Sequence, residues 1–136
     1  MNDLRYLLDT NICIYISKCR PLLVRQRFEN IESAAVGMSV ITWGELCFGA
    51  RKSQSSQRAM EVLEQLQSMI RVVPITTEVG EHYGDIRASL ERGGRPIGNN
   101  DLWIAAHARA LACTLVTNNE REFVRVPDLS VENWLN

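Results

Sequence analysis

Short apolar runs rich in β-branched residues alternate with helical segments along this 136-residue chain. The runs typical of strands are residues 5–9, 34–41, 72–75 and 114–117, and a last short run lies near 129–131. Continuous apolar strands separated by helices are typical of parallel sheets that are covered on both faces. The pattern therefore predicts an α/β fold, and the length suits a single domain over residues 1–136.

Capping residues indicate where the helices begin. Asp9, Thr10 or Asn11 can cap the first helix, and Thr42 suits the helix that follows the second strand. The segment 99–113 is apolar almost all round, so we expect it to be buried. Together these signals predict helices at about 11–18, 21–30, 42–52, 55–70, 78–92 and 99–113.

The composition is that of an ordinary globular protein and gives no global sign of a nucleic-acid partner. Charged residues make up 23% of the chain and the net charge is −1, so any RNA-binding surface must be local. No apolar run approaches the roughly 20 residues of a membrane helix, and the N-terminal residues do not resemble a signal peptide. We therefore expect a cytoplasmic protein.

Acidic residues recur where the predicted strands end. Asp9 closes the first strand, and Glu45 lies in the first turn of the helix after the second strand. Asp101 lies in the first turn of the apolar helix, and Glu120 and Glu122 follow the fourth strand. Ligands of open α/β sheets bind outside the carboxyl ends of the strands. We therefore expect these side chains to converge on one small volume.

Carboxylates that are brought together repel one another, and a divalent cation removes the repulsion. Oxygen ligands without a cluster of His or Cys favour Mg²⁺ or Mn²⁺, which can activate water and stabilise a phosphodiester transition state. Simpler interpretations stay open for each acid. Asp9 can be a helix cap, Glu45 and Asp101 can be partners of helix dipoles, and Glu120 and Glu122 can be surface residues.

Four stretches carry a resemblance to a known family: "LLDTNICIYI", "SVITWGELCFGARKS", "HYGDIRASLERGGRPIGNNDLWIAAHARA" and "LVTNNEREFVRVPDLSVENW". In this order and spacing they resemble the PIN-domain family, specifically the VapC ribonuclease toxins of VapBC type II toxin–antitoxin pairs. The subgroup that is most similar cleaves initiator tRNA. The resemblance implies a three-layer α/β/α sandwich around a parallel sheet of four to five strands.

The resemblance also implies roles for individual residues. Asp9 and Asp101 match metal-binding aspartates, and Glu45 matches a glutamate that holds the metal directly or through water. Asn11 and Thr117 match polar residues that shape the site.

A fourth acid is expected among the residues after the fourth strand. Many PIN domains have an aspartate where this chain has Asn119. Either Glu120 or Glu122 can take its place, and we favour Glu122 as the fourth catalytic residue. Asn119 and Glu120 are then expected to shape the site.

The implied function is that of a toxin whose metal-dependent endoribonuclease activity uses Mg²⁺, with Mn²⁺ as a substitute. Its RNA substrate would be initiator tRNA, cut in the anticodon region. A VapB-type antitoxin would block the site, and apolar residues of the helices at 11–31 and 55–70 would either offer it a groove or complete the toxin's own core. The toxin would form a homodimer, and a larger hetero-oligomer with the antitoxin is a further possibility. Two alternatives stay open: a PIN-like module that binds RNA or protein without cutting, and a HAD-like phosphatase, which requires an aspartate where Asn11 stands.

An RNA nuclease of this charge needs a local cationic rim. Trp43 and Trp103 flank the acidic positions and could stack on bases, although core packing is the simpler interpretation. His82 and His107 lie on predicted helices, and we assign neither as a general base. The cationic candidates for RNA binding are Lys18, Arg20, Arg25, Arg27, Arg51 and Arg95, with Lys52 beside them.

Overall fold

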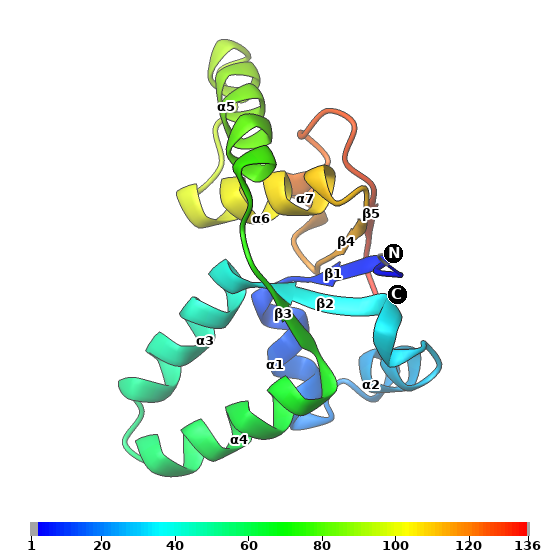
Figure 1. Ribbon diagram of the computed structural model, residues 1–136, viewed down its shortest axis with the longest axis vertical. Coiled ribbons are helices and arrows are strands. Elements are labelled where there is room, and N and C mark those ends of the chain that lie inside the picture. The colour runs from blue at the N-terminus through cyan, green and yellow to red at the C-terminus, as the bar shows by residue number, and fades with distance from the viewer. Residues whose placement is uncertain (1–2, 136) are drawn as a thin grey trace.

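The computed structural model describes residues 3–135 (Figure 1). The strands are β1 (Tyr6–Leu8), β2 (Val36–Ser39), β3 (Arg71–Val73), β4 (Thr114–Val116) and β5 (Val131–Glu132). The helices are α1 (Thr10–Lys18), α2 (Leu22–Glu29), α3 (Val40–Arg51), α4 (Ser56–Met69), α5 (Thr77–Arg92), α6 (Asn99–Ala110) and α7 (Glu120–Phe123), with a 3₁₀ turn at Ser33–Ala35.

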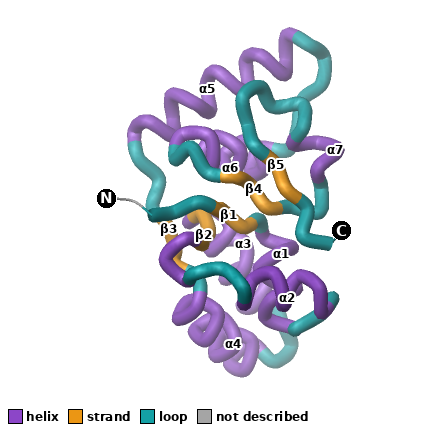
Figure 2. The backbone as a smooth tube through the Cα atoms, turned by 90° about the vertical axis from the view of Figure 1, so that its right-hand side faces the viewer, coloured by secondary structure: helices purple, strands orange, loops and turns teal. Residues whose placement is uncertain are grey.

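All five strands pair in parallel, in the order β3-β2-β1-β4-β5. Helices α1 to α4 lie on one side of the sheet, and α5, α6 and α7 lie on the other (Figures 1 and 2). The expected three-layer α/β/α sandwich is therefore confirmed. The chain leaves β1 toward β2 and β3, then returns to β4 on the other side of β1. The strand order thus changes direction beside β1, which is where open α/β sheets bind their ligands.

The strands are buried on both faces because successive side chains point to opposite sides of the sheet. Leu8 contributes to the core under α1 to α4, whereas Leu7 contributes to the core under α5 and α6. Val116 and Leu115 on β4 divide in the same way. All four side chains are fully buried. This explains why the strand sequences are continuously apolar rather than alternating.

Helix α3 begins earlier than the sequence predicts. Its N-cap is Ser39, whose hydroxyl accepts the N–H of Ile41 at 3.1 Å, so the prediction of Thr42 as the cap is wrong. The apolar residues Val40 and Ile41 resemble a strand in composition, but the cap at the end of β2 draws them into the helix. Glu45 consequently lies in the second helical turn and not in the first.

The other boundaries follow the predictions more closely. The helix that was expected to be apolar all round is α6, and residues 104–108 in it are all buried. Strand β3 ends at Val73, so the predicted strand 72–75 runs too far, because Pro74 has no N–H to donate to a ladder. Within residues 3–135, no helix has the length and apolar content needed to cross a bilayer.

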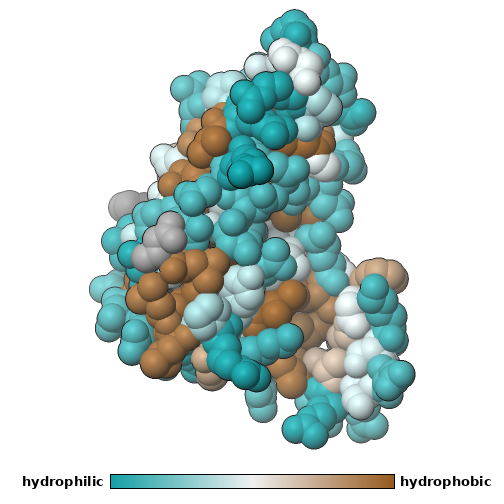
Figure 3. Space-filling view, turned by 180° about the vertical axis from the view of Figure 1, so that it is seen from behind, coloured by the Kyte–Doolittle hydropathy of each residue, from teal (hydrophilic) through white to brown (hydrophobic). Residues whose placement is uncertain are grey.

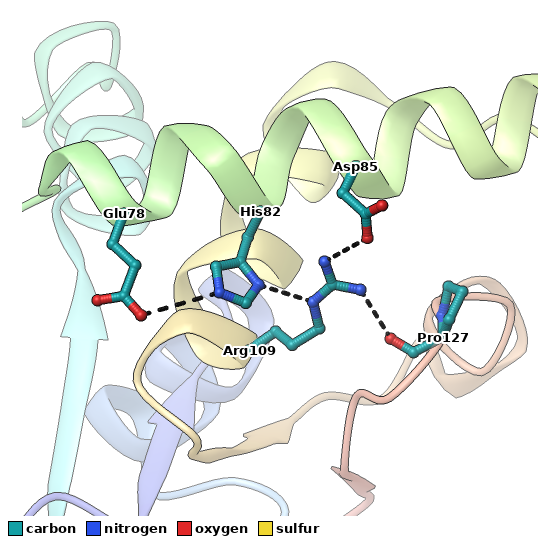
Figure 4. Close-up of polar contacts among 5 residues, drawn as sticks. All are labelled: Glu78, His82, Asp85, Arg109 and Pro127. Carbon is teal, nitrogen blue, oxygen red and sulfur yellow. Dashed lines mark hydrogen bonds and ion pairs between the residues drawn. The ribbon is translucent and has the colours of Figure 1, made fainter.

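Arg109 on α6 forms hydrogen bonds to α5 and to the loop before β5 (Figure 4). Its side chain is only 10% exposed. The guanidinium donates from Nε to His82 Nδ1 at 2.8 Å, from Nη2 to Asp85 at 2.7 Å and from Nη1 to the carbonyl of Pro127 at 3.0 Å. Glu78 lies 3.9 Å from the other ring nitrogen of His82. A planar, forked donor group is needed to reach three acceptors in different directions.

We predict that Arg109→Lys lowers Tm by about 3–6 °C, since an ammonium cannot reproduce three fixed directions. Thermal unfolding followed by circular dichroism would measure this. The matched control is Arg87→Lys, because Arg87 forms an exposed i,i+4 pair with Glu91 on the same helix that carries His82 and Asp85. Equal losses of Tm in the two variants would contradict the structural role of Arg109.

Candidate active site

Asp9 lies at the junction of β1 and α1, and both of its carboxylate oxygens are occupied. Oδ1 accepts the N–H of Ile12 at 3.0 Å, which makes Asp9 the N-cap of α1. Oδ2 accepts the hydroxyl proton of Thr117, which follows the neighbouring strand β4. The residue is 7% exposed. Burial raises the pKa of Asp9, and the hydrogen bonds from Thr117 and Ile12 oppose that rise.

Glu45 extends from α3 and is held by residues of two other helices. Its Oε1 accepts the hydroxyl proton of Thr10 at 2.6 Å, and its Oε2 accepts from Asn100 Nδ2 at 3.4 Å. Neither donor is among the site residues predicted from the sequence. Each is next to a predicted acid in the chain, since Thr10 follows Asp9 and Asn100 precedes Asp101, and this proximity could have identified them. Glu45 therefore links the start of α1 to the start of α6.

The pKa of Asp101 indicates that it lies close to three other predicted acids. The pKa of Asp101 is raised to about 6, first by burial, then by the charge of Glu122 and a hydrogen bond shared with it, and further by Glu45 and Asp9. Glu122 is itself oriented by Asn119, whose Nδ2 donates to it at 2.5 Å. The structure thus brings Asp9, Glu45, Asp101 and Glu122 together at the carboxyl ends of β1, β2 and β4.

The remaining predicted site residues lie at the edge of this cluster. Glu120 is exposed and accepts from Asn133 Nδ2 at 3.2 Å, so it is not part of the cluster that contains Glu122. Asn11 is exposed, with its Nδ2 3.5 Å from Asn118 Oδ1. Asn118 in turn donates to the hydroxyl of Tyr15 at 2.9 Å. Neither Asn118 nor Tyr15 is among the site residues predicted from the sequence, although Asn118 directly follows Thr117, which bonds to Asp9.

The donor chemistry of the cluster suits a hard divalent cation. In the part of the chain that the structure describes, no three side chains of His, Cys, Asp or Glu are placed so that together they could hold a metal ion. However, none of the ion pairs found within residues 3–135 reaches Asp9, Glu45, Asp101 or Glu122. The cluster therefore carries negative charge that no paired Lys or Arg neutralises. Carboxylate oxygens in such surroundings fit Mg²⁺ or Mn²⁺.

The cationic candidates lie in different surroundings. Arg25 donates to the carbonyl of Ile16 at 3.0 Å and pairs with Glu29 at 3.1 Å, so it ties α2 to α1. The two tryptophans are half-buried packing residues: Trp43 packs against the core under α1 to α4, and Trp103 stacks on Tyr83. The other cationic candidates are exposed or half-exposed, namely Lys18, Arg20, Arg27, Arg51 and Arg95.

A largely apolar groove of about 530 Å³ begins at the acidic cluster and runs between α1, α3 and α4. Seen from behind, hydrophobic side chains gather on the lower half of the molecule, which α1 to α4 form together (Figure 3). The helices predicted at 11–31 and 55–70 were expected to offer a groove, and α1 and α4 do line one. Its third wall is α3 and not α2. The groove is lined by Thr10, Ile14, Ser17, Lys18, Glu45, Leu46, Gly49, Ala50, Ser53, Ala59, Val62, Leu63 and Leu66.

Comparisons with known proteins agree with this architecture. The profile of the PIN domain family matches residues 6–129. The tRNA(fMet)-specific endonuclease VapC of Shigella flexneri is 45% identical over 131 residues, which cover 96% of this chain and 98% of that protein. Ribonuclease VapC2 of Haemophilus influenzae is 44% identical over 97% of this chain and 99% of its own length.

Solved structures give the same result. The DNA-bound VapBC of Salmonella typhimurium contains a chain with a TM-score of 0.91 and 41% identity, over 96% of this chain and 98% of that one. VapBC2 of Rickettsia felis, bound to a fragment of promoter DNA, gives a TM-score of 0.90 and 37% identity over 96% and 99%. The fold, the order of the acidic motifs and these likenesses agree. This chain belongs to the PIN-domain family, in its VapC branch.

Proposed function

We propose that this protein is a toxin of a type II toxin–antitoxin pair that cuts RNA as a Mg²⁺-dependent endoribonuclease. The observation that carries the proposal is the convergence of Asp9, Glu45, Asp101 and Glu122 on one volume, with no ion pair to Lys or Arg within residues 3–135. The names of the VapC relatives support RNA as the substrate. One of them is specific for tRNA(fMet), so we propose initiator tRNA, cut in the anticodon region.

The residues that would hold the ion are Asp9, Asp101 and Glu45. Bound there, Mg²⁺ would lower the pKa of a water molecule and offset the charge that develops on the scissile phosphate. The chain itself keeps the carboxylates in place before substrate arrives, through the hydroxyl of Thr117 on Asp9 and that of Thr10 on Glu45. Glu122, which lies against Asp101, is the group we propose to accept a proton from the attacking water.

The groove is the surface we propose for the antitoxin. Several solved relatives are VapBC complexes, which supports a VapB-type partner for this chain. An apolar segment of such a partner would bury the exposed side of Val62 and end beside Thr10 and Glu45, where it could block the site. We further propose that the toxin works in the cytoplasm, as a homodimer.

Labelled initiator tRNA tests the proposed activity. We predict that the wild-type protein cuts it only when Mg²⁺ or Mn²⁺ is present, and that Asp9→Asn and Asp101→Asn each lower the rate by about 100-fold or more. Asparagine preserves the capping acceptor at position 9, so folding should persist. Gel analysis of the fragments and circular dichroism of each variant would measure the two effects.

Two controls make this test specific. Asp128→Asn changes an exposed acid at a positive φ of 61°, which asparagine tolerates, and should leave the rate unchanged. Glu122→Gln should slow cutting by about 10-fold or more, whereas Glu120→Gln should not, if only Glu122 acts in the cluster. Cutting that survives in EDTA would overturn the metal mechanism. Binding of tRNA without any cutting would favour the alternative of a binding module.

The raised pKa of Asp101 predicts how stability depends on pH without metal. Because the folded pKa is about 6 and the ordinary value is 3.8, the folded state holds the proton more tightly between these values. Ionised Asp101 therefore destabilises the fold, and this effect grows as pH rises through that window and is complete above about pH 6.

We accordingly expect Asp101→Asn to gain stability over wild type on going from about pH 4 to about pH 7.5 in EDTA, by about 1 kcal/mol after discounting for the half-exposed position. Chemical unfolding at several pH values would measure the difference between the two proteins. Saturating Mg²⁺ should stabilise wild type more than Asp101→Asn. A constant difference across the pH range would show that neither burial nor the neighbouring acids raise the pKa of Asp101.

Substitutions on exposed valines test the groove. Val62 lines the groove and is 38% exposed, whereas Val124 is 67% exposed and lies outside it. We predict that Val62→Asp weakens binding of the cognate VapB-type antitoxin by about 10-fold or more, because a charge would be buried in an apolar contact. Val124→Asp should leave the Kd unchanged. Calorimetric titration of the purified toxin with antitoxin would measure both values, and equal Kd values would exclude the groove.

A further inference from the structure

A buried hydrogen bond joins the start of α3 to the middle of α6. The Oγ of Ser39 lies 2.8 Å from Nδ1 of His107, and both residues are fully buried. Ser39 ends β2 and caps α3, where its Oγ also accepts the N–H of Ile41 at 3.1 Å. Buried polar groups of this kind are retained only when they satisfy one another. The contact therefore fixes one helix against the other.

Ser39 Oγ makes a hydrogen bond to each of the two helices. It accepts the N–H of Ile41 on α3, and it shares a proton with Nδ1 of His107 on α6, where the tautomer of the ring decides which atom donates. Burial lowers the pKa of His107, so the ring is neutral at pH 7. The hydrogen bonds thus form a chain from the backbone of α3, through the serine hydroxyl, to a side chain of α6.

A serine beside a histidine is also the pair that many hydrolases use for nucleophilic attack. That role does not fit here. Ser39 has no exposed surface, and its oxygen is committed to capping α3, so a substrate cannot reach it. The role of the pair must therefore be structural and concern the residues that α3 and α6 hold in place.

Each helix carries one acid of the candidate site. Glu45 follows Ser39 by six residues on α3, and Asp101 precedes His107 by six residues on α6. We propose that the Ser39–His107 hydrogen bond is a positioning contact, which sets the spacing of Glu45 and Asp101 so that both can hold one divalent ion. This rests on the metal site of the proposed function. A second contact between these helices, from Asn100 to Glu45, is longer at 3.4 Å and exposed, so it constrains the spacing less.

Outer residues that orient metal ligands typically change metal affinity by about 10–100-fold when they are removed. The proposal therefore predicts a measurable loss of affinity without loss of the carboxylates themselves. Calorimetric titration with Mn²⁺ gives a readout that does not depend on RNA cutting. We expect His107→Leu, which removes the ring nitrogen that bonds to Ser39, to weaken Mn²⁺ binding by about 10-fold. The Mg²⁺ midpoint for tRNA cutting should rise in parallel, while KM for tRNA stays the same.

Conservative variants separate positioning from general stability. His107→Asn places a carbonyl oxygen near the position of Nδ1, and it should restore most of the Mn²⁺ affinity that His107→Leu loses. Ser39→Thr preserves the hydroxyl and Ser39→Ala removes it, so this second pair tests the same bond if the substitutions at position 107 prevent folding. His82→Leu is the matched control. It removes a helical histidine that bonds to Arg109 and makes no hydrogen bond to an acid of the candidate site.

The outcomes distinguish this proposal from the proposed function. Support requires weaker Mn²⁺ binding in His107→Leu and Ser39→Ala, recovery in His107→Asn and Ser39→Thr, and unchanged affinity in His82→Leu. The proposal is overturned, with the nuclease intact, if folded His107→Leu and Ser39→Ala bind Mn²⁺ as wild type does. Equal losses in all five variants would show a role in stability alone and would also overturn it. A wild-type protein that binds no Mn²⁺ would overturn the metal site itself and this proposal together.

Discussion

The candidate site depends on one buried carboxylate, that of Asp9. An ionised carboxylate at 7% exposure is costly unless donors replace the water that it loses. Here the N–H of Ile12 and the hydroxyl of Thr117 provide two such donors, and the N-terminal end of α1 adds its dipole. The same interactions join β1, α1 and the end of β4. A charged residue can therefore follow an apolar strand because hydrogen-bond donors stabilise its carboxylate where the strand ends.

The parallel sheet then determines where the other acids lie. When every strand runs in one direction, the helices that follow the strands begin at the same edge. Asp9 at the start of α1, Glu45 on α3 and Asp101 at the start of α6 meet there, and the short α7 adds Glu122. The repulsion among them opposes folding, and the divalent cation that we propose would relieve it. Stability lost at a functional site in this way is a common compromise in enzymes.

The acidic cluster and the apolar groove are not independent, because Thr10 and Glu45 line both. A partner that fills the groove would end at the carboxylates without any movement of the sheet. Lys18 lies along the same groove on α1 and offers a cation to a partner or to RNA phosphate. In the function that we propose, an antitoxin and the RNA substrate would therefore compete for one continuous surface. The hydrogen bond between Ser39 and His107 lies beneath this surface and ties α3, one of its walls, to α6.

Local patterns in the sequence were sufficient for the alternation of strands and helices, a parallel sheet covered on both faces, the burial of α6 and the acids near the strand ends. The three-layer sandwich of four to five strands was implied by the resemblance to PIN domains. These features depend on periodicity, capping and the order of motifs, all of which lie within short segments. The tertiary structure decided the rest. It selected Ser39 over Thr42 as the cap of α3 and α3 over α2 as a groove wall, and it placed Glu122, which the sequence favoured over Glu120, against Asp101. The last two depend on contacts between residues far apart in the chain, which no local pattern contains.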